Sequence, residues 1–299
     1  MGLLQAHSHA GGGIAEFFEE VVLHGVKDTL FIIPFLFLTY LLMEFIEHKS
    51  GGRAERFMKR AGRFAPIVGG ALGVIPQCGF SAAASNFYAG RVITLGTLVA
   101  VFLSTSDEML PILLSGSVGL GRAALLVLYK LVVGVAIGLI LDAVLRVLHK
   151  NDAEINIDNI CENDNCHCER GIFHSALHHT ITITVFVFIF TLIINAAVFF
   201  VGTEVIAEVL DGVPVLSHII AAILGLIPNC AVSVALATFY TNGFISVGTM
   251  LSGLFSGAGV GLLVLFKVNK NQKENLLAVV TLLVSGIVFG LIGDLIFNF

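Results

Sequence analysis

Apolar runs long enough to cross a bilayer alternate along the chain with short segments that carry most of its charges. The hydrocarbon core of a bilayer is about 30 Å thick, so a helix that crosses it needs about 20 apolar residues. This pattern predicts an all-α polytopic membrane protein. Six full crossings are expected, at residues 28–48, 92–114, 123–148, 176–202, 244–267 and 276–297.

One apolar segment occurs twice. Residues 75–88 read IPQCGFSAAASNFY, and residues 227–240, 152 positions later, read IPNCAVSVALATFY. The same offset relates Asp142 to Asp294, and each aspartate follows two glycines spaced four apart, a pattern that predicts helix packing and the capping of a helix end. A repeat of this kind indicates two related halves, and a repeated hydrophobic segment broken by Pro and Gly points to the central binding site of a transporter.

Each copy lies in an apolar segment interrupted at its middle, at 64–90 and at 217–242. About twelve residues precede the first break, a helix of about 18 Å, which reaches the membrane interior without crossing it. If both segments turn back, most Lys and Arg residues fall on the same side as the basic linker 49–63, whereas full crossings would move several of them outside. The positive-inside rule therefore favours two re-entrant helical hairpins, a cytoplasmic linker and an external N-terminus.

With re-entrant hairpins, each half contributes three full crossings plus one hairpin. An odd number of crossings turns the second copy upside down, which gives an inverted-topology repeat. We expect a first repeat at 1–148, a cytoplasmic linker at 149–174 and a second repeat at 175–299 in the inner (cytoplasmic) membrane of a cell.

Composition agrees with this architecture, because 57% of the residues are hydrophobic, 12% are charged and the mean hydropathy is +0.96. The lipid bilayer is thus one partner, and a net charge of −5 argues against a nucleic acid partner. The chain has no GxxxxGK[ST], HExxH or GxSxG motif, so we expect neither a nucleotide-driven motor nor an enzyme. No cofactor is expected, and homo-oligomerisation stays open.

Charged residues within two predicted crossings need a partner or a water-filled path, because a charge in hydrocarbon costs about 3 kcal/mol. Asp107 and Glu108 lie about 10 Å from the predicted outer end of one crossing, and Lys130 lies at a similar depth on the next. This spacing allows an ion pair between Lys130 and either carboxylate. These groups, together with Asp142 and Asp294, are candidates for coupling transport to a proton gradient.

The two breaks place a Cys beside an amide side chain in each half. Thiolates are soft ligands that suit arsenic, copper or zinc, whereas carboxylate, amide and backbone oxygens suit manganese or magnesium. A single Cys in a membrane helix is more often a small hydrophobic residue, but its recurrence at both breaks favours a functional role. The predicted substrate-binding set is Gln77, Cys78, Ser104, Asp107, Glu108, Asn229 and Cys230.

Three further groups near the predicted cytoplasmic surface carry metal-ligand chemistry. Residues 161–168 read CENDNCHC among acidic residues, and such thiols can bind a transition metal, although an acidic solvated linker is the alternative. The residues at 44–48 and at 174–178 each fall on one helical face, where they either bind an incoming ion or are solvated at the interface. The candidate metal ligands are Glu44, Glu47, His48, Cys161, Cys166, His167, Cys168, His174 and His178.

The segments STSDEML at 104–110 and MEFIEH at 43–48, together with the two Pro-x-Cys breaks and the Cys/His/acidic loop, resemble the ten-transmembrane heavy-metal exporter family. Members of that family are also described as manganese transporters and, loosely, as arsenic efflux proteins. The resemblance covers essentially the whole chain. It implies export of a metal or metalloid, and its ten hydrophobic helices agree with six crossings plus four hairpin arms.

The leading interpretation is a secondary transporter that exports a divalent heavy metal, with manganese favoured, or a metalloid, by alternating access. Two alternatives stay open. The first is a transporter of a small organic solute or anion, which the N-termini of hairpin helices could bind. The second is a membrane metal sensor or accessory subunit.

Overall fold

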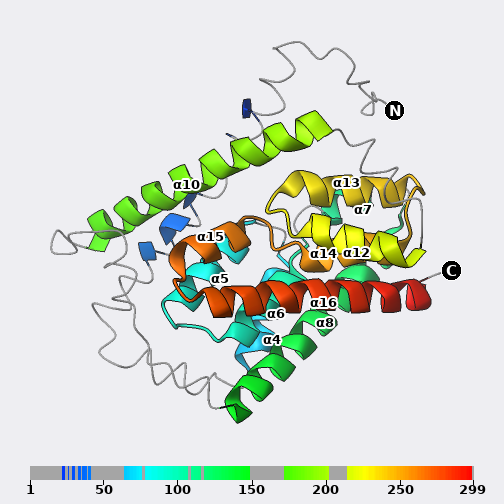
Figure 1. Cartoon of the computed structure of the whole chain (residues 1–299), viewed down its shortest axis with the longest axis horizontal. Helices are drawn as coiled ribbons and strands as arrows, with labels where there is room; N and C mark the ends of the chain where they lie inside the picture. The colour runs from blue at the N-terminus through cyan, green and yellow to red at the C-terminus, as the bar shows by residue number, and fades with distance from the viewer. Residues whose placement is uncertain are drawn as a thin grey trace.

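The computed structural model describes residues 64–75, 78–106, 109–115, 118–148, 172–201 and 214–297, and scattered positions between 22 and 41. The described part of the chain is helical and contains no strand (Figure 1). The helices are α4 (Ala65–Gly73), α5 (Cys78–Ala89), α6 (Leu95–Ser104), α7 (Met109–Ser115), α8 (Leu120–Val147), α10 (Ile172–Val201), α12 (Pro214–Gly225), α13 (Cys230–Thr241), α14 (Val247–Ser256), α15 (Val260–Val268) and α16 (Gln272–Phe297).

Five stretches in this part of the chain are long and apolar enough to cross a membrane. They coincide with five of the six predicted crossings, and the remaining one, at 28–48, lies mostly outside the described residues. A polytopic membrane protein is therefore confirmed at the level of helix length and composition. The five stretches are Leu95–Leu113, Leu120–Val147, Ala176–Ile193, Val247–Val268 and Gln272–Phe297.

Two predicted crossings, 92–114 and 244–267, are not continuous helices. In the second, α14 ends at Ser256 and α15 begins at Val260, because Gly259 adopts a left-handed conformation (φ 52°) that a helix cannot contain. In the first, Thr105 leaves helical geometry (ψ 129°) and caps the end of α6. Both remain candidate membrane spans by length and composition, but their interruptions were not predicted, because the apolar pattern continues through them.

The predicted breaks after α4 and after α12 are present, but the two arms on either side of each break do not pack mainly on one another. In the first half, α4 packs against α6 and α8, while α5 packs against α15 from the second half. In the second half, α12 packs against α14 and α16, while α13 packs against both α14 and α7. One arm of each break therefore packs against the other half, so the two halves are interlocked. The turn of each arm within the membrane stays a prediction.

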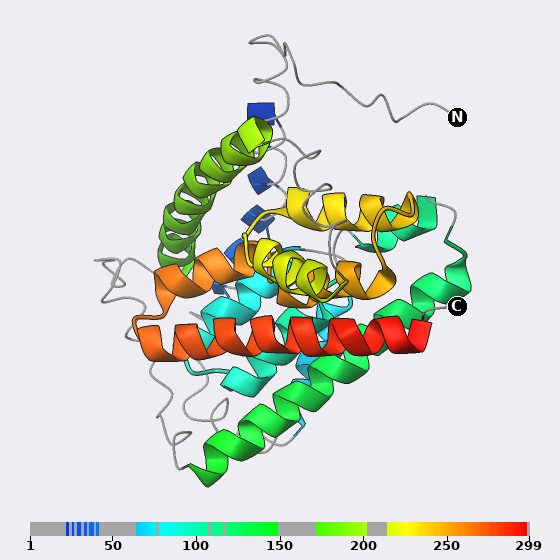
Figure 2. The same ribbon diagram turned by 45° about the vertical axis from the view of Figure 1, so that its right-hand side comes forward.

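The halves repeat the same packing around a straight outer helix. The long helices α8 and α16 hold equivalent places and run in broadly opposite directions (Figures 1 and 2). The broken stretches Leu95–Leu113 and Val247–Val268 are 81% and 83% buried, whereas the apolar windows of α8 and α16 are only 28% and 33% buried. The broken helices thus form the inside of the molecule, and the straight helices present apolar side chains to lipid.

In the first half, a carboxylate on the outer helix α8 forms hydrogen bonds with the start of the inner helix α6. Asp142, near the end of α8, accepts hydrogen bonds from the Gly96 backbone N–H (2.9 Å) and from Thr94 Oγ1 (2.6 Å). Thr94 is the N-cap of α6 and also accepts a hydrogen bond from the Thr97 amide. A Cβ atom on Gly96 would collide with the Gly138 carbonyl and with Asp142, so only glycine permits this close approach.

The second half contains the same arrangement 152 positions later. Asp294, near the end of α16, accepts hydrogen bonds from the Gly248 N–H (2.6 Å) and from Ser246 Oγ (2.8 Å). Ser246 is the N-cap of α14. The duplication noted in the sequence therefore corresponds to a duplicated helix-end cap, and both aspartates have a structural role.

Candidate functional site

In each half, the break that carries Pro and Cys lies beside the break of the following helix pair. Ser106, just after α6, donates a hydrogen bond to the Val74 carbonyl oxygen (3.3 Å) at the end of α4. In the second half, a Cβ atom at Gly257 would lie 3.5 Å from the Gly225 carbonyl oxygen and 3.7 Å from Ser233 Oγ. Four helix interruptions thus form two adjacent pairs, one pair in each half.

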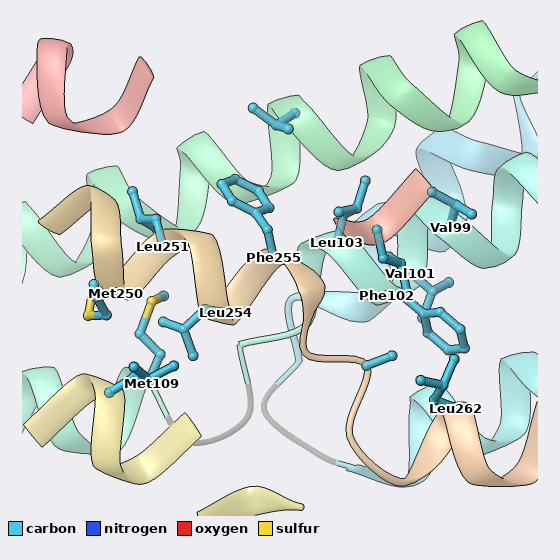
Figure 3. Close-up of a cluster of buried hydrophobic side chains, with 14 of the residues drawn as sticks. Val99, Val101, Phe102, Leu103, Met109, Met250, Leu251, Leu254, Phe255 and Leu262 are labelled. Atoms are coloured by element: carbon cyan, nitrogen blue, oxygen red, sulfur yellow. The ribbon is translucent and has the colours of Figure 1, made fainter. Parts of the chain in front are cut away.

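Apolar side chains fill the space beside these breaks. Phe102 and Leu103 from α6 and Leu254 and Phe255 from α14 are all buried, and Figure 3 shows them between the ribbons of the two halves. Met109, at the start of α7, lies beside Leu254 in the same view and is fully buried. In this conformation the centre of the molecule is tightly packed around the breaks.

Lys130 brings a cationic side chain into this packed region. It projects from α8, is fully buried and donates a hydrogen bond from Nζ to the Leu254 carbonyl oxygen (2.7 Å). Its Nζ also lies 5.5 Å from the ring centroid of Phe255, a cation–π distance. Lys130 therefore connects the first half to the last turn of α14 in the second half. The ion pair predicted with Asp107 or Glu108 involves residues outside the described part of the chain and stays a prediction.

The other members of the predicted binding set differ in how far they are described. Ser104 is fully buried and donates its hydroxyl to the Ala100 carbonyl oxygen (2.8 Å), so its oxygen can act toward a substrate as an acceptor. Asn229 is 5% exposed, and its backbone N–H donates a hydrogen bond to the Ile227 carbonyl oxygen (2.7 Å). Cys78 and Cys230 are the first residues of α5 and α13, at equivalent positions in the two halves.

Most of the predicted metal ligands cannot be placed. Among the described residues, no group of three or more His, Cys, Asp or Glu side chains is positioned to hold a metal ion. His174 and His178 are exposed on α10, as an interfacial position requires, but this part of the structure supplies no third ligand. The predicted residues that lie outside the described part are Glu44, Glu47, His48, Gln77, Asp107, Glu108, Cys161, Cys166, His167 and Cys168.

A buried polar contact beside α10 was not predicted. His179 is 1% exposed and stacks on Tyr40 with ring centroids 5.3 Å apart. The Tyr40 hydroxyl donates a hydrogen bond to Asn86 Oδ1 (2.9 Å) on α5. These three side chains connect Tyr40, in the predicted crossing 28–48, with α5 and α10, and the apolar sequence around them gave no sign of the contact.

An ion pair between the halves was also missed. Arg91, after α5, meets Glu274, in the first turn of α16, with Nη1 2.8 Å from Oε2 and Nη2 3.2 Å from Oε1. The Tyr88 hydroxyl donates a second hydrogen bond to Glu274 Oε2 (2.6 Å). A signal was available in the sequence, since the position equivalent to Arg91 is Gly243, so the charged residue is present in one half alone.

Comparison with known families identifies the chain. A family model described as "Putative, 10TM heavy-metal exporter" matches residues 18–175, more than half of the sequence. The chain belongs to this heavy-metal exporter family. No curated protein and no solved structure shows significant similarity to it. The match begins at residue 18 and covers the rest of the predicted first repeat and the predicted linker, and the 152-residue offset relates the predicted second repeat to this region.

Proposed function

We propose that this exporter is a secondary transporter that moves a divalent heavy-metal ion, manganese in the first place, out of the cytoplasm by alternating access. The observation that carries the proposal is the duplicated set of broken helices in a member of a heavy-metal exporter family. Broken helices expose backbone carbonyls and amides at membrane depth, where they bind ions, and repeats of opposite orientation allow the site to open to either side in turn.

The architecture supports an inverted repeat with re-entrant hairpins in the inner membrane. Equivalent helices pack in the same way in both halves, and α8 and α16 run in broadly opposite directions (Figure 2). In this proposal the N-terminus is external and residues 149–174 are cytoplasmic, as the distribution of Lys and Arg requires. The hairpin segments 64–90 and 217–242 enter from opposite sides.

The oxygen atoms around the breaks favour a hard cation. The described groups are the carbonyls of Val74, Gly225 and Leu254, the hydroxyl of Ser104 and the side-chain amide of Asn229. Oxygen ligands select manganese-type ions. A soft ion or a metalloid would instead require the thiols of Cys78 and Cys230, and arsenite is therefore the second candidate cargo.

Flux through the purified protein tests this function. In proteoliposomes that contain a metal-sensitive dye, the protein should carry Mn²⁺ along an imposed gradient, and empty liposomes should not. A protein that binds Mn²⁺ without any flux would be a sensor or an accessory subunit, and the transport proposal would fail.

Two variants separate hard-ion from soft-ion chemistry. Asp107→Asn with Glu108→Gln should abolish Mn²⁺ flux, whereas Cys78→Ser with Cys230→Ser should leave it within about twofold of wild type. Residues 203–216 lie outside in the same topology, so neutralising two acidic residues there, Glu204→Gln with Asp211→Asn, is the matched control for the loss of charge. If only the cysteine pair abolishes Mn²⁺ flux, the thiols rather than the carboxylates bind the ion.

A further inference from the structure

The arms exchanged between the halves form two pairs of helices, an inner arm pair of α5 with α15 and an outer arm pair of α13 with α7. The 152-residue offset relates α5 to α13 and α7 to α15, so the two pairs are equivalent. Figures 1 and 2 show α5 and α15 beside the start of α16, and α7 and α13 toward its other end. The two arm pairs therefore lie at opposite ends of the helix bundle.

The inner arm pair is closely packed. Ser85 Oγ on α5 donates a hydrogen bond to the Gly261 carbonyl oxygen (2.6 Å) on α15. A Cβ atom on Gly261 would lie 2.7 Å from the Cβ of Ser81, so only glycine permits this approach. In the proposed topology the end of the hairpin 64–90 and the start of α16 both face the cytoplasm. In that topology the inner arm pair closes the cytoplasmic side of the interface between the halves.

Polar side chains hold α5 to the first turn of α16. Arg91 and Tyr88, at the end of α5, both contact Glu274, and these three residues are named the inner latch. Asn269, at the end of α15, donates from Nδ2 to Asn275 Oδ1 (2.7 Å), and Asn275 Nδ2 donates to the Asn269 carbonyl oxygen (2.9 Å). Because the two buried asparagines fix α15 to α16, the inner latch connects α5 to a rigid unit of the other half.

The outer arm pair has no equivalent of this latch. The repeat places Gly243 at the position of Arg91, Arg122 at that of Glu274 and Ala123 at that of Asn275. Gly243 and Ala123 lack the groups for these contacts, and Arg122 is exposed, without an ion pair among the described residues. The caps at Asp142 and Asp294, in contrast, are the same in both halves. The latch is therefore an addition to one end of a duplicated framework.

This asymmetry determines which side of the molecule is closed. In an exact inverted repeat, the state closed to the cytoplasm and the state closed to the outside would have equal energies, because each half takes the place of the other. Residues that differ between the halves make one state more stable. The latch stabilises closure of the inner arm pair alone. Burial agrees, since Ser81 on α5 is 1% exposed, whereas the equivalent residue on α13, Ser233, is partly exposed.

We propose that the inner arm pair is the cytoplasmic gate of the exporter, that the outer arm pair is its external gate, and that the inner latch holds the cytoplasmic gate closed at rest. The inference rests on the proposed function and names the parts that move in it. Entry of the cargo requires Arg91 to separate from Glu274 and α5 to leave α15. This motion uncovers the hydroxyls of Ser81 and Ser85, which suit a water-filled path. Opening of the external gate breaks no ion pair of this kind.

Access of a reagent to α5 is the first test. Ser81→Cys places a thiol between α5 and α15, and Ser233→Cys places one at the equivalent position of the outer arm pair. Full-length protein in lipid nanodiscs, which expose both faces of the membrane, is treated with a maleimide. Mass spectrometry then measures the label at each position separately from the five native cysteines. With the latch intact, we expect slower labelling at position 81 than at position 233.

Variants of the latch form the second test. Arg91→Gly removes the ion pair together with the left-handed strain. It should speed labelling of Ser81→Cys by up to about fivefold, the equivalent of an ion pair of about 1 kcal/mol, without speeding that of Ser233→Cys. Arg91→Glu with Glu274→Arg reverses the pair and should restore slow labelling, whereas Glu274→Arg alone should not. Lys273→Gln removes an exposed charge beside Glu274 and is the control, with labelling as in wild type.

The outcomes separate this inference from the proposed function, because labelling does not depend on transport. Labelling of Ser81→Cys that Arg91→Gly leaves unchanged would overturn the inference. An equal rise at both labelled positions would also overturn it, since the ion pair would then be a general structural contact. Mn²⁺ flux in wild type, combined with either result, leaves the transporter without this gate. If wild type shows no flux of Mn²⁺, Zn²⁺, Cd²⁺ or arsenite, the proposed function fails, and the gate fails with it.

Discussion

Arg91 occupies a backbone conformation that favours glycine, and this allows a sharp test of the contact between the halves. Its φ is 58°, and the equivalent residue after α13, Gly243, has a φ of 78°. Both positions end a helix with the same hydrogen bond, from the Val92 amide to the Phe87 carbonyl oxygen (2.7 Å) in the first half. A side chain in the left-handed region costs about 1 kcal/mol, so Arg91 destabilises the backbone locally.

The ion pair with Glu274 offsets this cost. The two side chains are 24% and 26% exposed, so their attraction contributes about 1 kcal/mol rather than the larger value of a fully buried pair. The hydrogen bond from Tyr88 to the charged Glu274 adds about 1.5 kcal/mol. The contact as a whole therefore stabilises the interface of α5 and α16 by about 2 to 3 kcal/mol.

Four variants separate these contributions. Arg91→Ala should lose about 1 kcal/mol, because the ion pair disappears and the strained backbone remains. Arg91→Gly should be close to wild type, because relief of the left-handed strain compensates for the lost pair. Glu274→Ala should lose about 2.5 kcal/mol. Gly243→Ala is the control: a Cβ atom there meets nothing within 4 Å, so its loss of about 1 kcal/mol measures the backbone cost alone.

The free energy of unfolding of each purified variant can be measured in mixed detergent by titration with SDS, followed by circular dichroism. The double variant Arg91→Ala with Glu274→Ala completes a cycle whose coupling energy should be about 1 kcal/mol. The reasoning is refuted if Arg91→Gly is no more stable than Arg91→Ala, since the left-handed strain would then be absent. A coupling energy near zero would refute the ion pair.

Three further predictions follow from the same contacts. Asp142→Ala and Asp294→Ala should each reduce the free energy of unfolding by about 2 to 4 kcal/mol, since each removes an acceptor for two hydrogen bonds, and similar losses in the SDS titration would show that the two caps are equivalent. Gly96→Ala should be at least as damaging, because its Cβ would displace Asp142 from α6; a melting temperature equal to wild type would contradict the close approach. Burial acts to lower the pKa of Arg91, but the hydrogen bond to and charge of Glu274 outweigh it and hold the pKa above its usual value. Arg91 therefore stays charged at every pH below its pKa, so titration of Arg91 should not alter the difference in unfolding free energy between wild type and Arg91→Gly from about pH 6 to about pH 10. The SDS titration repeated across this pH range measures that difference.

The sequence predicted the long helices α8 and α16 and the breaks after α4 and α12, but not the interruptions within 92–114 and 244–267. Helices α8 and α16 were expected at nearly their observed bounds, because each is a long apolar run that starts and ends at polar residues. The break between α14 and α15 was missed because Gly257, Ala258 and Gly259 are as apolar as their neighbours. The backbone conformation of Gly259 depends on packing that no local pattern contains.

In the candidate site, too, the sequence predicted some features and missed others. Lys130 was recognised from the cost of its charge in an apolar helix, which the sequence states directly. Its described partner is the carbonyl oxygen of Leu254, a backbone atom that every residue has, so no side-chain pattern could have pointed to it. The exchange of arms between the halves was missed for a similar reason, since the contact of Ser85 with the Gly261 carbonyl oxygen (2.6 Å) joins residues 176 positions apart.

His218 provides a test of a general hypothesis about the repeat, that differences between equivalent positions mark function. Its Nε2 lies 3.0 Å from Asp294 Oδ2, and the side chain of His218 is 3% exposed, whereas the equivalent residue in the first half is Pro66. Asp142 and Asp294 make the same caps, so the histidine is an addition to a complete network rather than a part of it.

We therefore predict that His218→Gln retains the cap and leaves the free energy of unfolding within about 1 kcal/mol of wild type, while the rate of metal flux loses part of its dependence on the pH of one compartment. The SDS titration and the flux assay measure these two properties separately. A variant that loses stability as Asp294→Ala does, with flux per folded molecule unchanged at every pH, would mean that the histidine is structural. In that case, differences between the halves would not by themselves locate function.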